Sequence, residues 1–353
     1  MFSIIKHAHT NRRNAGILAA SIAFAVAGLN NQAHAQQVEK SSRAGSGIYE
    51  AVVNSNDGHI YVTGAGTRST PGGAIYKINP ETLAIVDSIV LKDNPPFGIG
   101  INNKTNIAYT TNTRTNSVSA VDLKNGKLLA TFSNGSEKSH VREVLVDEAK
   151  NLIYVSNVGD PSDIWVIDGK TNTVLHTIEN TGKTTTGLAF NDKKDKLFVT
   201  NMGTNEVAVI DLASKKVEKS FSSGGESPVN IVAEGERLFV TNQKSGTVTV
   251  LNSKTGEVLK SIPTGEGAIG IAYDKKTNKI YSANRSTGTT TVIDGKTYAV
   301  LADLATGSHP NHVKVDPKTG VAYVINKTKG GRPVEGQPAP GPDTNGDTIS
   351  KIK

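Results

Sequence analysis

Short stretches of apolar and hydroxyl-bearing residues recur along the chain, each opening with an aromatic residue. Three clear copies are Tyr154-Val155-Ser156-Asn157, Phe198-Val199-Thr200-Asn201 and Phe239-Val240-Thr241-Asn242. The aromatic residues that open the copies are Tyr61, Tyr109, Tyr154, Phe198, Phe239, Tyr281 and Tyr323, with gaps of 48, 45, 44, 41, 42 and 42 residues. A period of this length in a chain rich in β-forming residues is typical of small sheets repeated around a ring.

Each repeat predicts four strands. The first is an apolar strand such as residues 141–146, and the second is the aromatic motif. The third ends in Asp or Asn, as at Asp168 and Asn252, and the fourth is a strand such as residues 257–262. Short segments rich in Val, Ile, Thr and Tyr with turns between them favour strands, and helical periodicity is absent. We therefore expect an all-β chain that folds as a seven-bladed β-propeller of four-stranded blades.

The Asn that ends most copies of the motif has a structural interpretation. Its side chain can satisfy polar groups where a strand bends into a turn. The seventh repeat, in contrast, is one strand short, because only residues 348–352 offer a further strand after Tyr323. A ring with an unpaired edge invites aggregation. We expect residues 37–44 to supply the missing outer strand, so that the N-terminal strand closes the C-terminal blade.

The N-terminus has the composition of an export signal. Lys6, Arg12 and Arg13 precede an apolar run over 16–29, which is short for a membrane span, and Ala33-His34-Ala35 is a small-x-small cleavage site. We expect a signal peptide over 1–35 and the propeller over 36–353. Within the propeller, residues 328–347 are rich in Pro and Gly and predict a flexible loop.

Composition narrows the function classes. Removing the three basic residues of the signal lowers the net charge from +7 to +4, so net charge alone gives only weak attraction to polyanions. The absence of cysteine excludes disulfides and thiolate chemistry. A dinucleotide-like Gly265-x-Gly267-x-x-Gly270 is followed by a strand rather than a helix, and no Ser lies in a Gly-x-Ser-x-Gly elbow. His140, His309 and His312 could approach the axis as metal ligands, but ordinary polar roles are favoured. We expect no metal and no other cofactor.

One face of the ring carries the candidate ligand-binding residues. In a propeller, the loops that lead into the inner strands and the loops that follow the second strands emerge on the same face. These loops are rich in groups that hold anions or stack on flat rings, and they also include Lys327 and Lys329, whereas the opposite turns carry lysine pairs such as Lys193-Lys194. The residues we expect to bind ligand are Tyr49, Glu50, Phe97, Arg114, Arg142, Glu143, Lys183, Arg285, His309 and Asn311.

Several segments are more specific than the repeated motif. They are Gly47-Ile48-Tyr49-Glu50, Pro96-Phe97-Gly98, Arg142-Glu143, Asn180-Thr181-Gly182-Lys183 and His309-Pro310-Asn311. Together with the repeats, and over essentially the whole mature chain, they resemble the Tyr-Val-Thr-Asn family of seven-bladed propellers, in particular the periplasmic YncE-like proteins. The resemblance implies a periplasmic propeller able to bind single-stranded DNA, an association with iron-responsive expression, and no catalytic activity.

These observations favour a non-enzymatic periplasmic binding protein, acting as a monomer, whose ligand is single-stranded DNA or another polyanion held on this face. Two alternatives stay open. The wide, rigid face of a propeller also suits an adaptor that docks onto an envelope protein, such as an outer-membrane transporter. The central funnel could also hold an enzyme site with Glu50, Glu143 and His309 as acid and base groups, although fold analogy does not define a mechanism.

Overall fold

The structure is a computed structural model that describes residues 36–67, 71–136, 139–329 and 342–353. The signal peptide predicted over 1–35 and the central part of the loop predicted over 328–347 lie outside these residues. The last residues of that loop are described, and they are hydrogen-bonded into the fold. Asp343 Oδ1 accepts a hydrogen bond from Ser308 Oγ at 2.6 Å, and Asp347 Oδ2 accepts one from the Gly47 amide at 3.0 Å.

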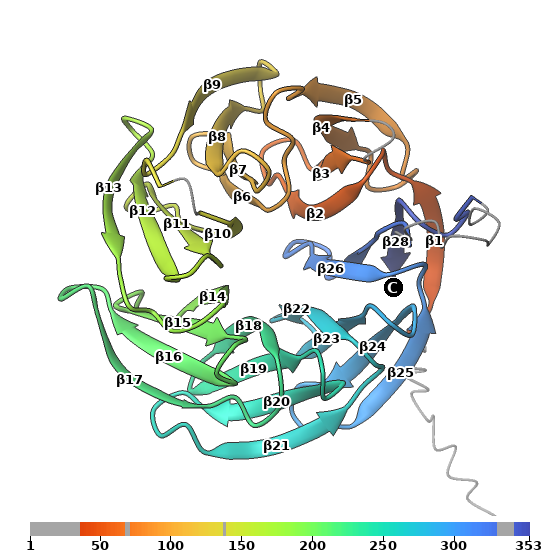
Figure 1. Cartoon of the computed structure of the whole chain (residues 1–353). Coiled ribbons are helices and arrows are strands. Elements are labelled where there is room, and N and C mark those ends of the chain that lie inside the picture. Colours follow the sequence, from red (N-terminus) through yellow and green to blue (C-terminus); the bar gives the residue numbers. More distant parts are fainter. Residues whose placement is uncertain (1–35, 68–70, 137–138, 330–341) are drawn as a thin grey trace, which may run out of the picture. The chain divides into compact units, whose positions relative to one another are not determined.

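The described residues form seven antiparallel four-stranded sheets arranged in a ring, which confirms the predicted seven-bladed β-propeller (Figure 1). We number the blades in chain order. The innermost strands of blades one to seven are β2 (Ile48–Val53), β6 (Ile99–Asn102), β10 (Val141–Asp147), β14 (Thr185–Phe190), β18 (Pro228–Glu234), β22 (Ala268–Asp274) and β26 (Pro310–Val315). The second strands, which carry the aromatic motif, are β3 (Ile60–Gly66), β7 (Ile107–Asn112), β11 (Leu152–Asn157), β15 (Lys196–Asn201), β19 (Arg237–Asn242), β23 (Lys279–Asn284) and β27 (Ala322–Asn326).

The two remaining strands of each blade lie farther from the axis. The third strands are β4 (Pro71–Ile78), β8 (Ser117–Asp122), β12 (Asp163–Asp168), β16 (Glu206–Asp211), β20 (Thr247–Asn252), β24 (Thr289–Asp294) and β28 (Thr348–Ile352). The outer strands of blades one to six are β5 (Ile85–Val90), β9 (Lys127–Phe132), β13 (Thr173–Ile178), β17 (Lys216–Ser222), β21 (Val258–Pro263) and β25 (Val300–Ala305).

The seventh blade takes its outer strand from the other end of the chain. Strand β1 (Val38–Arg43) pairs antiparallel with β28, and Ser42 lies opposite Ile349. The pairing extends beyond the strand, because the Gln37 amide donates to the Lys353 carbonyl at 2.9 Å and the Ala44 amide donates to the Asp347 carbonyl at 2.9 Å. The closure predicted by counting strands is therefore confirmed.

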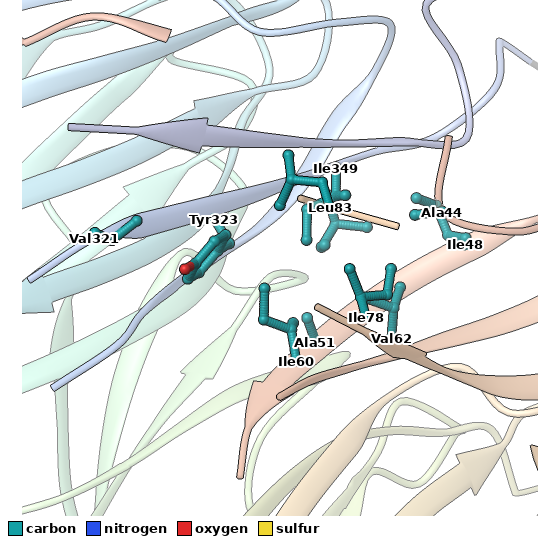
Figure 2. Packing of buried hydrophobic residues seen from close by; sticks show 11 residues of the cluster. Ala44, Ile48, Ala51, Ile60, Val62, Ile78, Leu83, Val321, Tyr323 and Ile349 are labelled. Carbon is teal, nitrogen blue, oxygen red and sulfur yellow. The ribbon is translucent and has the colours of Figure 1, made fainter. Parts of the chain in front are cut away.

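Apolar side chains fill the space between neighbouring blades. Figure 2 shows one such cluster, in which Ile48 and Val62 of blade one pack with Tyr323 and Ile349 of blade seven. All four are at most 2% exposed. Each blade therefore buries its two faces against its neighbours, so the ring is stabilised by area that leaves water only when the blades assemble.

The third residue of the repeated motif joins one blade to the next. Thr200 Oγ1 accepts a hydrogen bond from the Gly187 amide of its own blade at 2.8 Å and donates to the Val229 carbonyl of the next blade at 2.7 Å. Thr111 and Thr241 make the equivalent pairs of bonds. A single hydroxyl thus satisfies two buried backbone groups of different sheets, which fixes the inner strands around the axis.

The motif asparagine stabilises the fold as the sequence predicts. In blade six, Asn284 Nδ2 donates to the hydroxyls of Thr289 and Thr291 at 3.1 and 2.8 Å. In blade four, Asn201 Nδ2 donates to the Thr181 carbonyl at 2.9 Å. The residue is buried in both blades, so it holds the end of the second strand rather than contacting solvent or ligand.

Candidate ligand-binding site at the ring axis

A cavity of about 340 Å³ lies on the axis, at the end of the ring where the chain enters the inner strands. We call it the mouth cavity. Its wall comes from two positions of the repeat, the start of the inner strand and the residue that follows the motif asparagine. The lining residues are Tyr49, Phe97, Thr113, His140, Arg142, Val158, Thr186, Met202, Val229, Gln243, Ile269 and Arg285.

Aromatic rings and cations are combined on one side of the mouth cavity. Tyr49 and Phe97 pack edge to face with ring centroids 5.3 Å apart. Lys327 Nζ lies 4.2 Å from the centroid of Tyr49, and the guanidinium of Arg114 lies 5.3 Å from the centroid of Phe97. Rings in this arrangement are held in place, and the cations beside them form no ion pair with a carboxylate of the described residues.

Arg285 is fixed through Asn311. Its Nη2 donates to Asn311 Oδ1, and Asn311 Nδ2 donates to the Tyr49 carbonyl at 2.8 Å. The Nε of Arg285 is buried and has no hydrogen-bond partner among the described residues. A buried guanidinium nitrogen without an acceptor is costly, so this donor favours a ligand that brings one.

The positively charged groups around the mouth cavity destabilise one another's charged forms. Burial, followed by the charges of Arg285 and Arg142, lowers the pKa of Lys327 to about 8. Burial also lowers the pKa of Arg285, with Arg142 acting in the same direction. Burial and Arg285 lower the pKa of His309 as well. Positive charges that destabilise one another in this way are stabilised by a bound anion.

A layer of polar side chains lies one residue deeper along the inner strands. In every blade, the inner-strand residue that pairs with the second residue of the motif is aliphatic. This shared position allows the seven inner strands to be compared residue by residue. The residue before it is polar in blades one, three, five and seven and glycine in the other three blades. In chain order these residues are Glu50, Gly98, Glu143, Gly187, Asn230, Gly270 and His312. We call the four side chains Glu50, Glu143, Asn230 and His312 the polar layer.

Arg142 connects the mouth cavity to the polar layer. Its Nη1 donates to Asn230 Oδ1 at 3.3 Å and lies 3.5 Å from Glu143 Oε2. Glu50 Oε2 accepts a hydrogen bond from the Ile99 amide at 3.2 Å. Burial, followed by the charge of Glu143, raises the pKa of Glu50 well above its ordinary value, and burial also raises the pKa of Glu143. The pair therefore holds protons more tightly than exposed carboxyl groups do.

This pKa shift predicts a pH-dependent gain in stability for Glu50→Gln. The folded-state pKa of Glu50 is raised, so its favourable contribution is complete below the ordinary value of 4.5 and is lost as pH rises through the folded-state value. Glutamine cannot ionise and can still accept the Ile99 amide. We expect the variant to melt at a higher temperature than the parent at neutral and alkaline pH, with no difference in acid. Melting curves between about pH 4 and pH 9 measure this, with exposed Glu257→Gln as control. A difference in melting temperature that does not change with pH would contradict the raised pKa of Glu50.

The structure brings most of the predicted site residues together. Tyr49, Phe97, Arg142 and Arg285 line the mouth cavity, and Arg114 and Asn311 contact residues of its wall. Glu50 and Glu143 lie deeper, in the polar layer. The His309 carbonyl accepts the Lys327 amide at 3.1 Å, which puts His309 beside the cations. Lys183 is exposed and does not line the cavity; its carbonyl accepts the Gly203 amide at 3.0 Å.

Seven lining residues were not singled out as candidate ligand-binding residues from the sequence, namely Thr113, Val158, Thr186, Met202, Val229, Gln243 and Ile269. Thr113, Val158, Met202 and Gln243 each follow the motif asparagine directly, as Arg285 and Lys327 do. Their shared position after the motif asparagine is the feature of the sequence from which these four residues could have been predicted. Val158, Met202, Val229 and Ile269 add apolar surface to a lining that also contains Arg142 and Arg285.

Within the described ranges, no three His, Asp or Glu side chains gather as a metal ion would require. The same ranges contain no helix long and apolar enough to cross a membrane.

The ring and its cation- and aromatic-lined mouth define a β-propeller with an axial cavity. The chain belongs to the YncE-like β-propeller family, whose model matches residues 17–279. Over 221 residues it is 30% identical to the uncharacterized protein YncE of Escherichia coli (strain K12), which covers 60% of this chain and 61% of that protein. Over 181 residues it is 36% identical to YncE of Salmonella typhi, covering 49% and 51%. The chain thus matches between about half and three fifths of the length of these relatives.

The same architecture occurs in a solved structure of hydrazine synthase from Kuenenia stuttgartiensis. The TM-score is 0.67 at 17% sequence identity, and the alignment covers 79% of this chain and 92% of that one. At this level of identity the similarity establishes the fold alone.

Proposed function

We propose that this chain is a non-enzymatic, periplasmic binding protein whose mouth cavity takes single-stranded nucleic acid or a related polyanion. The observation that carries the proposal is the convergence of Arg142, Arg285 and Lys327 beside the Tyr49–Phe97 pair. Phosphate groups would relieve the repulsion among the cations and accept from the unpaired Nε of Arg285. Single-strand binding proteins combine the same two elements, basic side chains and aromatic rings on which bases stack.

The shape of the cavity favours an unpaired strand over a duplex. Its volume of about 340 Å³ lies at the lower end of the range of roughly 300–1,000 Å³ that accommodates small ligands. A base must leave its duplex to expose its face inside such a pocket. The apolar lining residues Val158, Met202 and Ile269 suit the face of a base, and the lining arginines suit its phosphate.

We expect a labelled oligo-thymidine to bind with an affinity that falls as salt concentration rises, because phosphate contacts release counterions. Arg285→Ala should weaken binding by roughly 1–3 kcal/mol, or about 5- to 150-fold, and should flatten the salt dependence. Tyr49→Leu should weaken binding by a similar amount with an unchanged salt slope, because it removes stacking rather than charge. Fluorescence anisotropy across a salt series measures both effects.

The matched control is Lys193→Ala, which removes an exposed cation from the opposite turns and should bind as the parent does. No binding at low salt, or equal binding by Arg285→Ala and the parent, would overturn the proposal. Recovery of one stoichiometric envelope protein after nuclease treatment, without oligonucleotide binding, would favour the adaptor function instead.

A further inference from the structure

A second cavity of about 260 Å³ lies on the axis beyond the mouth cavity. We call it the inner cavity. One aliphatic residue from each of the seven inner strands surrounds it, at the register position opposite the second residue of the motif. These residues are Ala51, Ile99, Val144, Leu188, Ile231, Ile271 and Val313. A collar of aliphatic residues offers apolar surface on which a hydrocarbon chain can pack.

Three nitrogen donors line the inner cavity without an acceptor among the described residues. They are Asn230 Nδ2, His312 Nε2 and Lys314 Nζ. The Asn230 side chain is oriented by Arg142, which donates to its oxygen at 3.3 Å and leaves its nitrogen for the cavity. The His312 ring is oriented by the Ala51 amide, which donates to Nδ1 at 3.3 Å. Burial lowers the pKa of His312 to about 3, so the ring is neutral and its proton resides on Nε2.

The side chains that line the inner cavity offer fewer charged acceptors than donors. Glu143 is the one lining carboxylate, and its buried Oε2 has no hydrogen bond, although it lies 3.5 Å from Arg142 Nη1. Burial, followed by the charge of Glu143, raises the pKa of Glu50 in the polar layer, and burial lowers the pKa of Lys314. The cavity therefore offers three nitrogen donors and a single lining carboxylate.

We propose that the inner cavity is a second binding site, distinct from the mouth, and that it takes a small monocarboxylate with a short aliphatic chain. The carboxylate would accept from Lys314 Nζ, His312 Nε2 and Asn230 Nδ2, and the chain would pack on the aliphatic collar. A volume of about 260 Å³ is below the usual range of roughly 300–1,000 Å³, which favours a molecule smaller than a nucleotide. A carboxylate brings two acceptor oxygens to the three donors, and it places one negative charge rather than two beside the carboxyl group of Glu143.

The test is calorimetric titration of the full mature chain with sodium butanoate, with 1-butanol and butylammonium chloride as probes of equal chain length. We expect saturable binding of butanoate alone. Lys314→Met should weaken it about tenfold or more, since a hydrogen bond to a charged group is lost. His312→Gln should retain part of the affinity, because its amide still provides a donor. Lys296→Met, an exposed lysine on a turn, should bind as the parent does.

Oligonucleotide binding by Lys314→Met should equal that of the parent, which establishes that the variant is folded and that the two cavities are separate. Equal binding of 1-butanol and butanoate would overturn the carboxylate assignment. Unchanged butanoate affinity in Lys314→Met, or displacement of butanoate by the oligonucleotide, would overturn the second site.

Discussion

Deleting residues 36–44 is expected to cause the largest loss of stability of any change considered for this protein. The deletion removes β1, which pairs with β28 along its length, and it removes the fully buried Ala44. Each lost backbone hydrogen bond contributes about 1 kcal/mol, and β28 becomes an open edge. Lys351, which is 1% exposed, also loses its partner Glu39 at 3.5 Å and retains Glu81 at 2.9 Å.

Thermal melting compares the deletion with the parent and with Lys40→Ala, which changes one exposed side chain of the same strand. We expect the control to stay within about 0.5 kcal/mol of the parent and the deletion to melt far below both. A synthetic peptide of residues 36–44, added in excess, should recover part of the lost stability by re-adding the strand to the edge. A deletion that melts like the parent would show that β1 does not close the ring.

The fold could be predicted because its information is local and repeated. The spacing of Tyr61, Tyr109 and their equivalents defines the blades, and counting strands identifies the incomplete seventh blade. The same local reading explains the role of the asparagines, since each one bonds to residues of its own repeat, as Asn284 does with Thr289 and Thr291. These features need no knowledge of how distant segments meet.

The candidate site could be predicted only in outline. Topology alone places the loops on one face, which was enough to find Tyr49, Phe97, Arg142 and Arg285. The contacts that shape the site join residues far apart in the chain, such as Arg142 with Asn230 and Asn311 with Tyr49. No pattern in the sequence predicts such pairs of distant residues.

The sequence also did not show how far along the axis each side chain of an inner strand lies. Lys183 is exposed although it belongs to a distinctive segment, and Lys314 lines the inner cavity although it belongs to an ordinary strand. Whether a side chain reaches the axis depends on its register in the inner strand, which is fixed by pairing with the second strand. That register becomes visible only when all seven blades are aligned around one axis.

The alternation of glycine and polar side chains at the axis leads to the last prediction. Gly98, Gly187 and Gly270 occupy the register position at which Glu50, Glu143, Asn230 and His312 carry side chains. A Cβ on Gly98 would overlap the backbone carbonyl oxygen of Arg142. On Gly187 it would lie 2.6 Å from the Val229 carbonyl oxygen, and on Gly270 it would lie 2.8 Å from the Asn311 carbonyl oxygen. All three obstacles are backbone atoms of the next blade, so they cannot rotate away.

We therefore expect alanine to destabilise the protein in the order Gly98, Gly187, Gly270, with Gly98→Ala at or above the upper end of the roughly 1–3 kcal/mol typical of overpacking. Gly58→Ala is the control: its Cβ would meet nothing within 4 Å, so only its φ of 71° opposes the change, at about 1 kcal/mol. Denaturant or thermal unfolding of the four variants gives the order directly, and a Gly98→Ala variant as stable as Gly58→Ala would contradict it. Because the displaced carbonyl belongs to Arg142, whose guanidinium bonds Asn230, Gly98→Ala should also weaken oligonucleotide binding, whereas Gly58→Ala should not. The glycines of the even-numbered blades thus allow the backbone of the inner strand in the next blade to approach closely.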